Sequence, residues 1–312
     1  MKQDYLKRSA ILVVAGLILS GSASALFGKK AELPPEGAPT VREITVKTYR
    51  DIPYSAQFLA SDAEGEDMSF SVVDQPRKGS VVIDGVNFIY TPNEGALGND
   101  RFTYTATDSS GNTSVPAVVT VTIQKTKSGV TYSDTDAKSA FSAQEMAERG
   151  VFLGSRIGEN WYFEPQRNVS RSEFLAMTME IAEREVTHVS MTGFADDETI
   201  PVWAKAYAAA GVADGILQGS ATEAGAVFRG EDPITFHEAA TILDRVLSVE
   251  DVDISLRYAD REAVPGWAAQ AVGNLEAATV LATGSFGSAE MEQCVTRSDA
   301  AQLLLAAKEL MK

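Results

Sequence analysis

The sequence predicts a multidomain α+β protein, in which a β-sandwich of roughly immunoglobulin size precedes a mainly α-helical part built from three repeats. Apolar and polar residues alternate from Ile44 to Ile123, which is the period of half-buried strands. Beyond a short linker at residues 125–130, helical spacing with many alanines continues to Lys312. One polar tetrapeptide recurs three times in this second part, which predicts a repeated helical unit.

The N-terminal residues 1–25 have the pattern of a secretory signal peptide. Three basic residues precede an apolar run that ends near Leu19, and Ala23-Ser24-Ala25 forms a small-x-small cleavage site. A transmembrane helix is the alternative, but the run is shorter than the roughly 20 residues that a bilayer span needs. We therefore expect a secreted protein with no membrane span after cleavage. A proline-containing linker at residues 26–40 follows the signal peptide.

Composition limits the partners and the chemistry. The formal net charge of −16 argues against binding to nucleic acid or anionic lipid, because a polyanion is repelled at long range. Cys294 is the only cysteine, so no intramolecular disulfide can form, and we interpret it as a small buried hydrophobe. Neither of the two histidines lies in a catalytic motif and no phosphate-binding glycine loop is present, so we expect no enzyme and no cofactor.

Acid-rich turns in the first part raise the question of a Ca²⁺ site. They lack the ordered acid spacing of an EF-hand, so we prefer solvated turns and predict no metal. The carboxylates in question are Asp62, Glu64, Asp67 and Asp108.

Residues 41–124 carry the strand pattern and a resemblance. Turns such as "DAEGED", "QPRKG" and "DSSGN" separate about seven short strands. The alternating pairs and triplets are Ile44/Val46, Met68/Phe70/Val72, Val86/Phe88/Tyr90, Phe102/Tyr104/Ala106 and Val119/Val121/Ile123. The stretch "QPRKGSVVIDGVNFIYTPNEGALGNDRFTYTATDSSGNTS" resembles the bacterial cadherin-like or Ig-like modules of surface proteins.

The recurring tetrapeptide has the form of a helix capping box. A hydroxyl residue at the N-cap is followed three positions later by a carboxylate, just before an apolar run. The three boxes are almost evenly spaced along the chain, as expected for one unit used three times. The predicted boxes pair Ser170 with Glu173, Thr235 with Glu238 and Thr296 with Asp299.

Other landmarks recur in step with the boxes. Each unit opens with an aromatic-x-Asp motif whose acid is Asp134, Asp196 or Asp260, and we expect these acids to accept local turn or cap hydrogen bonds. Trp203 and Trp267 follow the second and third motifs at the same spacing. The loops "GVFLG" and "GILQG" precede the first and second boxes by the same interval.

This order resembles the S-layer homology domain, a module that usually occurs in threes. The resemblance places the repeats at 128–190, 191–254 and 255–312 and rests most on the boxes "VSRSE", "ITFHE" and "VTRSD". It implies a mainly α-helical, pseudo-threefold triplet whose grooves bind a secondary cell-wall polysaccharide, often through a pyruvate ketal on N-acetylmannosamine. It also implies other S-layer or surface proteins as partners and a location at the cell wall.

The repeats depart from the family pattern. The first unit has no tryptophan at the position of Trp203 and Trp267, where the spacing from Tyr132 gives Phe141 and the spacing from Gly150 gives Lys138. The second box has Phe236 in place of arginine, and we expect His237 beside it to have only a structural role. The third unit lacks the Gly-aromatic-Pro stretch. We therefore expect at least one groove to be degenerate.

Six residues are predicted to bind the polymer, each with a structural alternative. An arginine at a helix N-terminus is unfavourable against the helix macrodipole, so the two box arginines are expected to have an anionic partner. That partner is either an acid of the neighbouring repeat or a glycan carboxylate that also accepts free N–H groups of the helix. The resemblance favours the glycan carboxylate. The tryptophans are either core anchors or sugar platforms, and the glycines either turn residues or points of close ligand approach. The six are Arg171, Arg297, Trp203, Trp267, Gly154 and Gly219.

The sequence thus predicts a secreted, non-catalytic surface protein that is anchored to the wall by its repeats and displays an Ig-like module. The chain ends in "AAKELMK" without a hydrophobic tail or sortase signal, so retention is expected to need a binding domain. The alternative is an adhesin whose Ig-like module binds a host or neighbouring-cell ligand. Arg171→Ala with Arg297→Ala is predicted to release the protein from walls without changing its melting temperature.

Overall fold

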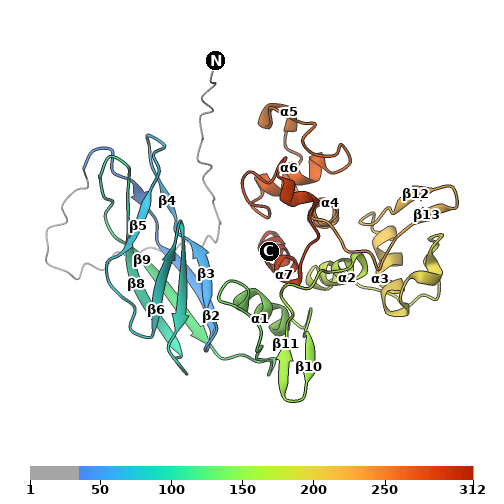
Figure 1. The fold of residues 1–312 in the computed structure, drawn as a ribbon, viewed down its shortest axis with the longest axis horizontal. Helices are drawn as coiled ribbons and strands as arrows, with labels where there is room; N and C mark the ends of the chain where they lie inside the picture. The colour runs from blue at the N-terminus through green and yellow to red at the C-terminus, as the bar shows by residue number, and fades with distance from the viewer. Residues whose placement is uncertain (1–34, 312) are drawn as a thin grey trace. The chain divides into compact units, whose positions relative to one another are not determined.

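The computed structural model describes residues 35–311, so the predicted signal peptide and most of the linker lie outside the described residues. The chain forms two compact units. One reaches to Lys127 and includes Asp136–Phe141, and the other consists of Ser128–Thr135 and the chain from Ser142 onward. Figure 1 shows the strands of the first unit and the helices and hairpins of the second.

The first unit is a β-sandwich, as the alternation predicted. The order β2-β9-β8-β5 forms a four-stranded sheet, β3-β7-β6 forms a three-stranded sheet, and β1 pairs with β4. All strand pairs are antiparallel except β2 with β9. The strands are β1 (Thr40–Val41), β2 (Ile44–Tyr49), β3 (Tyr54–Gln57), β4 (Ala60–Ser61), β5 (Ser69–Val72), β6 (Gly79–Asp84), β7 (Asn87–Pro92), β8 (Gly98–Thr107) and β9 (Ala117–Gln124).

The core of the sandwich comes from the inward members of the alternation. Phe88, Tyr90, Phe102 and Tyr104 are fully buried. The buried Asp100 of β8 links the sheets, because its carboxylate accepts the Tyr90 hydroxyl of β7 at 2.8 Å and also the N–H groups of Arg77 and Lys78 in the loop before β6. Each of the five alternating segments forms a strand, although Met68 and Val86 lie one residue before β5 and β7. The strands β3 and β6 and the two short strands complete the fold.

The second unit contains three helix pairs. The first helices of the repeats are α1 (Ala140–Glu148), α3 (Val202–Ala213) and α6 (Ala269–Ala277), and the second helices are α2 (Arg171–Ile181), α4 (Phe236–Leu247) and α7 (Arg297–Leu310). The first two repeats also carry hairpins, β10 (Ser155–Ile157) with β11 (Asn160–Tyr162) and β12 (Ser220–Thr222) with β13 (Gly225–Val227). Shorter elements are α5 (Ile254–Arg257) and the 3₁₀ turns η1 (Asp197–Thr199) and η2 (Ala289–Glu292).

Three backbone segments close a cycle at the centre of this unit. The N–H of Val169 donates to the carbonyl of Val295 at 2.9 Å, Val295 donates to Ile234 at 2.8 Å, and Ile234 donates back to Val169 at 3.0 Å. Each residue immediately precedes a capping box and is buried. The three second helices therefore start around one pseudo-threefold axis and pack against one another in a shared core.

All three predicted capping boxes are present. The N-cap hydroxyl accepts the N–H of the third helical residue, and the carboxylate there accepts the N-cap N–H, at 2.9 Å for Ser170, 3.1 Å for Thr235 and 2.9 Å for Thr296. The first helix of the next repeat then packs on each of the first two second helices, α3 on α2 and α6 on α4. In the third repeat, η2 occupies the chain position where the others have a hairpin.

The described residues contain neither a membrane-spanning helix nor a cluster of metal-ligating side chains. No helix within residues 35–311 combines the length and apolarity needed to cross a bilayer. The same residues contain no group of three or more histidine, cysteine, aspartate or glutamate side chains placed to hold a metal ion.

Candidate functional site

A groove runs along the junction between the first and second repeats. It consists of two adjoining cavities of about 280 and 300 Å³ that share Val169, Glu173 and Trp203. The first cavity is mainly apolar and reaches Arg297 of the third repeat, so all three repeats contribute to the groove. Its other lining residues are Val151, Phe152, Ala176, Met177, Glu180 and Tyr207, and the second cavity adds Arg167, Asn168, Ser170, Glu231 and Pro233.

The two tryptophans are surface residues. Trp203 lies in the first turn of α3 and is 51% exposed, and Trp267 lies just before α6 and is 61% exposed. The interpretation of both as core anchors is therefore wrong. A half-exposed indole offers a flat apolar face together with an N–H donor, which suits contact with a partly polar ligand.

A hydrogen bond joins two of the side chains that line the first cavity. The hydroxyl of Tyr207 on α3 donates to Glu180 on α2. This bond to a carboxylate, together with burial, raises the pKa of Tyr207 to about 12, so its hydroxyl keeps its proton. Glu180 and Glu173 leave this side of the groove rich in hydrogen-bond acceptors.

Arg297 is buried beside the groove. Its guanidinium donates to the carbonyl of Phe163 at 2.9 Å, pairs with Glu164 at 3.4 Å and lies 4.4 Å from the centre of the Phe152 ring. Burial lowers its pKa from the usual value, with the nearby Arg167 adding to the effect. All of these partners belong to the first repeat, whereas Arg297 itself belongs to the third.

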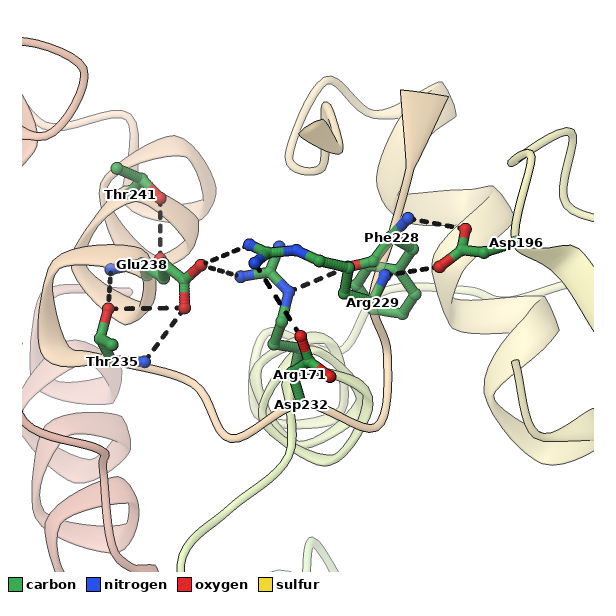
Figure 2. Close-up of polar contacts among 8 residues, drawn as sticks. All are labelled: Arg171, Asp196, Phe228, Arg229, Asp232, Thr235, Glu238 and Thr241. Carbon is green, nitrogen blue, oxygen red and sulfur yellow. Dashed lines mark hydrogen bonds and ion pairs between the residues drawn. The ribbon is translucent and has the colours of Figure 1, made fainter. Parts of the chain in front are cut away.

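Arg171 bonds the equivalent carbonyl one junction further on but pairs with a different acid (Figure 2). Its Nε donates to the carbonyl of Phe228 at 2.9 Å, and its Nη1 pairs with Glu238 at 2.6 Å. Arg229 approaches the same Glu238 oxygen at 3.1 Å. Only 8% of the Arg171 side chain is exposed, and burial lowers its pKa.

These contacts correct one part of the sequence interpretation. The N–H groups of Arg171 and Ser172 already donate to carbonyls of Asp232 and Gly230, and those of Arg297 and Ser298 donate to Arg167 and Pro165. They are not free for a ligand carboxylate. Both arginines instead pair with an acid of the neighbouring repeat, which was the structural alternative, while direct polymer contact by either arginine stays a prediction.

The backbone itself explains why positions 154 and 219 are glycine, without any contact to a ligand. Their φ angles are +72° and +70°. A Cβ at Gly154 would lie 2.2 Å from the carbonyl oxygen of Tyr162, and one at Gly219 would lie 2.8 Å from that of Val227. Both glycines thus allow the start of a hairpin to meet its own returning strand, and their predicted role in polymer binding stays untested.

The aspartates of the aromatic-x-Asp motifs act over a longer range than predicted. Asp134 accepts the N–H groups of Phe163 and Glu164 at 2.8 and 2.7 Å, and Asp196 accepts those of Phe228 and Arg229 at the same two distances. These contacts join the motif at the start of each repeat to the two residues that follow its hairpin, and they are not local turns. The repeated motif marked the acids in the sequence, but no local pattern indicated their distant partners. Asp260 alone bonds locally, to the N–H of Glu262.

Asp196→Ala is expected to lower the free energy of unfolding by about 3 kcal/mol, because the backbone N–H groups of Phe228 and Arg229 lose a charged acceptor worth roughly 1.5 to 3 kcal/mol per bond before partial rehydration. Asp260→Ala is the matched control and should cost less than about 1 kcal/mol, since its single bond is local and exposed. Urea unfolding measures both. Equal losses in the two variants would contradict the hairpin role.

The second box differs in its contacts as well as its sequence. Phe236 packs partly buried against the helical core. His237 is 5% exposed, its Nε2 has no hydrogen-bond partner among the described residues, and burial lowers its pKa. Its ring meets the Trp267 ring edge to face at 6.2 Å between centres. Cys294 is partly buried, not fully buried as expected.

Comparison with known proteins agrees with the Ig-like part of the prediction. Residues 36–124 match the family model described as bacterial Ig domain. The surface-layer 125 kDa protein of Lysinibacillus sphaericus is 31% identical over 106 residues, which are 34% of this chain and 8% of that protein. The chain thus spans a small part of the curated relative that it matches.

The solved structures that match this chain have low sequence identity and low TM-scores. The endo-fucoidan hydrolase MfFcnA4 of glycoside hydrolase family 107 is 16% identical, covering 30% of this chain and 14% of its own, with a TM-score of 0.25. The fibronectin(III)-like modules of Clostridium thermocellum CbhA are 19% identical, covering 28% and 47%, with a TM-score of 0.20. Scores of this size carry no argument about activity.

The fold and the site together define a class: a protein with a bacterial Ig domain followed by a pseudo-threefold helical unit that has a tryptophan-lined groove at a repeat junction. The bacterial Ig domain family is the one assignment that the comparisons give, and it applies to residues 36–124.

Proposed function

We propose that this chain is a non-catalytic cell-surface protein whose helical unit binds a secondary cell-wall polysaccharide and so holds the protein on the wall. The bacterial Ig domain and the similarity to a surface-layer protein support a cell-surface location. The groove beside Trp203 is the observation that carries the binding proposal. The helical unit is proposed to be a triplet of S-layer homology repeats, with the pyruvate ketal of the polymer as one feature that it recognises.

The chemistry of the groove suits a sugar. An exposed indole can stack on the C–H face of a pyranose, and carboxylates with free lone pairs accept sugar hydroxyls. Trp203 supplies the first feature, and Glu180 and Glu231 supply the second. Two adjoining cavities of about 280 and 300 Å³ provide room for more than one sugar unit.

Wall binding is the direct test. The full chain is expected to sediment with purified walls, and Trp203→Ala with Trp267→Ala should weaken this at least tenfold, since a central aromatic contact contributes about 2 kcal/mol or more and tenfold corresponds to about 1.4 kcal/mol. Trp161→Ala is the matched control, because this tryptophan lies in β11 and lines neither cavity of the groove. Binding that survives the double substitution, or that is lost equally in the control, would remove the groove from the proposal.

A further inference from the structure

The chain contains two histidines, and their surroundings differ. His188 is exposed in the segment between α2 and η1, whereas His237 lies in the first turn of α4 and is 5% exposed. An unperturbed imidazole changes its charge between about pH 5 and 8. His237 therefore brings a group that titrates near neutral pH into the interior of the helical unit.

The other two capping boxes have serine where the second box has His237. The two residues are Ser172 and Ser298, and all three side chains at this position are buried. A serine hydroxyl remains neutral at any pH at which the chain is folded. Only the second of the three helix starts therefore has a side chain at this position that acid can charge.

The imidazole of His237 packs in surroundings that suit its neutral form. Trp267, which faces the ring from the segment before α6, is uncharged and meets it edge to face at 6.2 Å between ring centres. The Nε2 atom is buried and has no hydrogen-bond partner among the described residues. Protonation would add a positive charge and leave Nε2 as a donor without an acceptor, which is costly for a buried group.

The charged groups around His237 do not offset this cost. Glu292 of η2 favours the charged imidazole, but this carboxylate is exposed and burial has the larger effect, so the pKa of His237 is lowered. Glu238, the next residue of α4, is already paired with Arg171 at 2.6 Å and with Arg229 at 3.1 Å. The positive end of the α4 dipole also opposes a cation in the first turn.

Acid therefore destabilises the closed form of this helix start. Because the pKa of His237 is lowered in the folded unit, an opened α4 start binds the proton more readily than the closed one. The stability that the neutral imidazole contributes is complete above about pH 6.5, the pKa of an exposed histidine, and declines as the pH falls below it. Asp244 near the other end of α4 acts in the opposite direction, since burial raises its pKa and its protonation favours the folded form.

We propose that His237 is a pH sensor of the helical unit. Its protonation in mild acid opens the start of α4 and the contact with Trp267, while the helix starts that carry Ser172 and Ser298 stay closed. The junction between the second and third repeats thus loosens before the other two junctions do. This inference goes beyond the proposed function and does not depend on wall binding.

Three matched backbone amides report on the three helix starts. Each donates to the N-cap carbonyl of its own helix at 2.9 Å, and they belong to Phe174, Ala239 and Ala300. Hydrogen exchange of the full chain at about pH 7.5 and about pH 5.5, corrected for the intrinsic exchange rates, measures how often each amide opens, and both values lie above the range of ordinary carboxylates. Opening at Ala239 is expected to rise by about tenfold in acid, which is the most that one proton with a pKa of about 6.5 in the opened form gives. Phe174 and Ala300 should change by less than about twofold.

Two histidine variants assign the effect to one residue. His237→Gln keeps a polar side chain that does not titrate and should abolish the rise at Ala239, whereas His188→Gln is the matched control and should keep it. Thermal melts near neutral pH check folding, and His237→Ser, which restores the residue of the other two boxes, replaces a His237→Gln variant that unfolds. The proposal is overturned if the wild type shows no rise at Ala239, if the rise persists without His237, if it is lost without His188, or if all three amides open equally in acid.

Discussion

Arg171→Ala is expected to lower the free energy of unfolding of the helical unit by about 3 kcal/mol, the lower end of the range for breaking a buried ion pair. The loss leaves the Phe228 carbonyl without its side-chain donor and opens space at the junction of two repeats. The effect stays at the lower end because Glu238 keeps Arg229 as a partner. At roughly 2 to 4 °C per kcal/mol, the melting temperature should fall by about 6 to 12 °C.

Arg167→Ala is the matched control for this prediction. Arg167 also pairs with a capping-box acid, Glu173 at 2.8 Å, but its side chain is 42% exposed. An exposed pair is worth about 0 to 1 kcal/mol, so this variant should melt within a few degrees of the wild type. If Arg171→Ala melts like Arg167→Ala and only loses wall binding, the sequence-based expectation of a purely ligand-binding arginine would stand instead.

Gly154→Ala is expected to cost about 3 kcal/mol and to disrupt the β10–β11 hairpin. The new Cβ would lie 2.2 Å from the Tyr162 carbonyl oxygen, which is backbone and cannot rotate away, and the φ of +72° adds strain for any L residue. Because this hairpin also positions the two N–H groups held by Asp134, the loss should spread to that contact.

Gly158→Ala in the same hairpin separates the two causes. Its φ is +64°, but no atom lies within 4 Å of the added Cβ, so only the backbone contribution of about 1 kcal/mol remains. Chemical denaturation of both variants, with hydrogen exchange at residues 160–163, measures the difference. Similar costs for the two glycines would mean that the close approach to Tyr162 is unimportant.

Much of the fold follows from patterns within single segments. Alternation predicted the strands that contain Phe88, Phe102 and Val119, since a strand with one buried face needs an apolar residue at every second position. The boxes predicted where α2, α4 and α7 begin, because capping depends on residues only three positions apart. The spacing between boxes predicted that these helices belong to one repeated unit.

The site is less predictable because its contacts join distant residues. No local pattern indicated that Arg297 reaches the carbonyl of Phe163 or that Arg171 shares Glu238 with Arg229. Residue type alone favoured the core for Trp203 and Trp267, yet both lie at the surface, because the alanines and glycine of the first helices already fill the space against their neighbours. Exposure is a property of the packed helices and not of the residue.

The sequence by itself determined the period of the strands, the three helix starts and the unequal boxes of the repeats. Only the tertiary structure decided that Val169, Ile234 and Val295 close a hydrogen-bonded cycle, and this cycle brings each box against the loop of another repeat. The physical reason is range: capping and alternation are set by neighbours along the chain, whereas burial and charge pairing depend on which repeat lies across the junction.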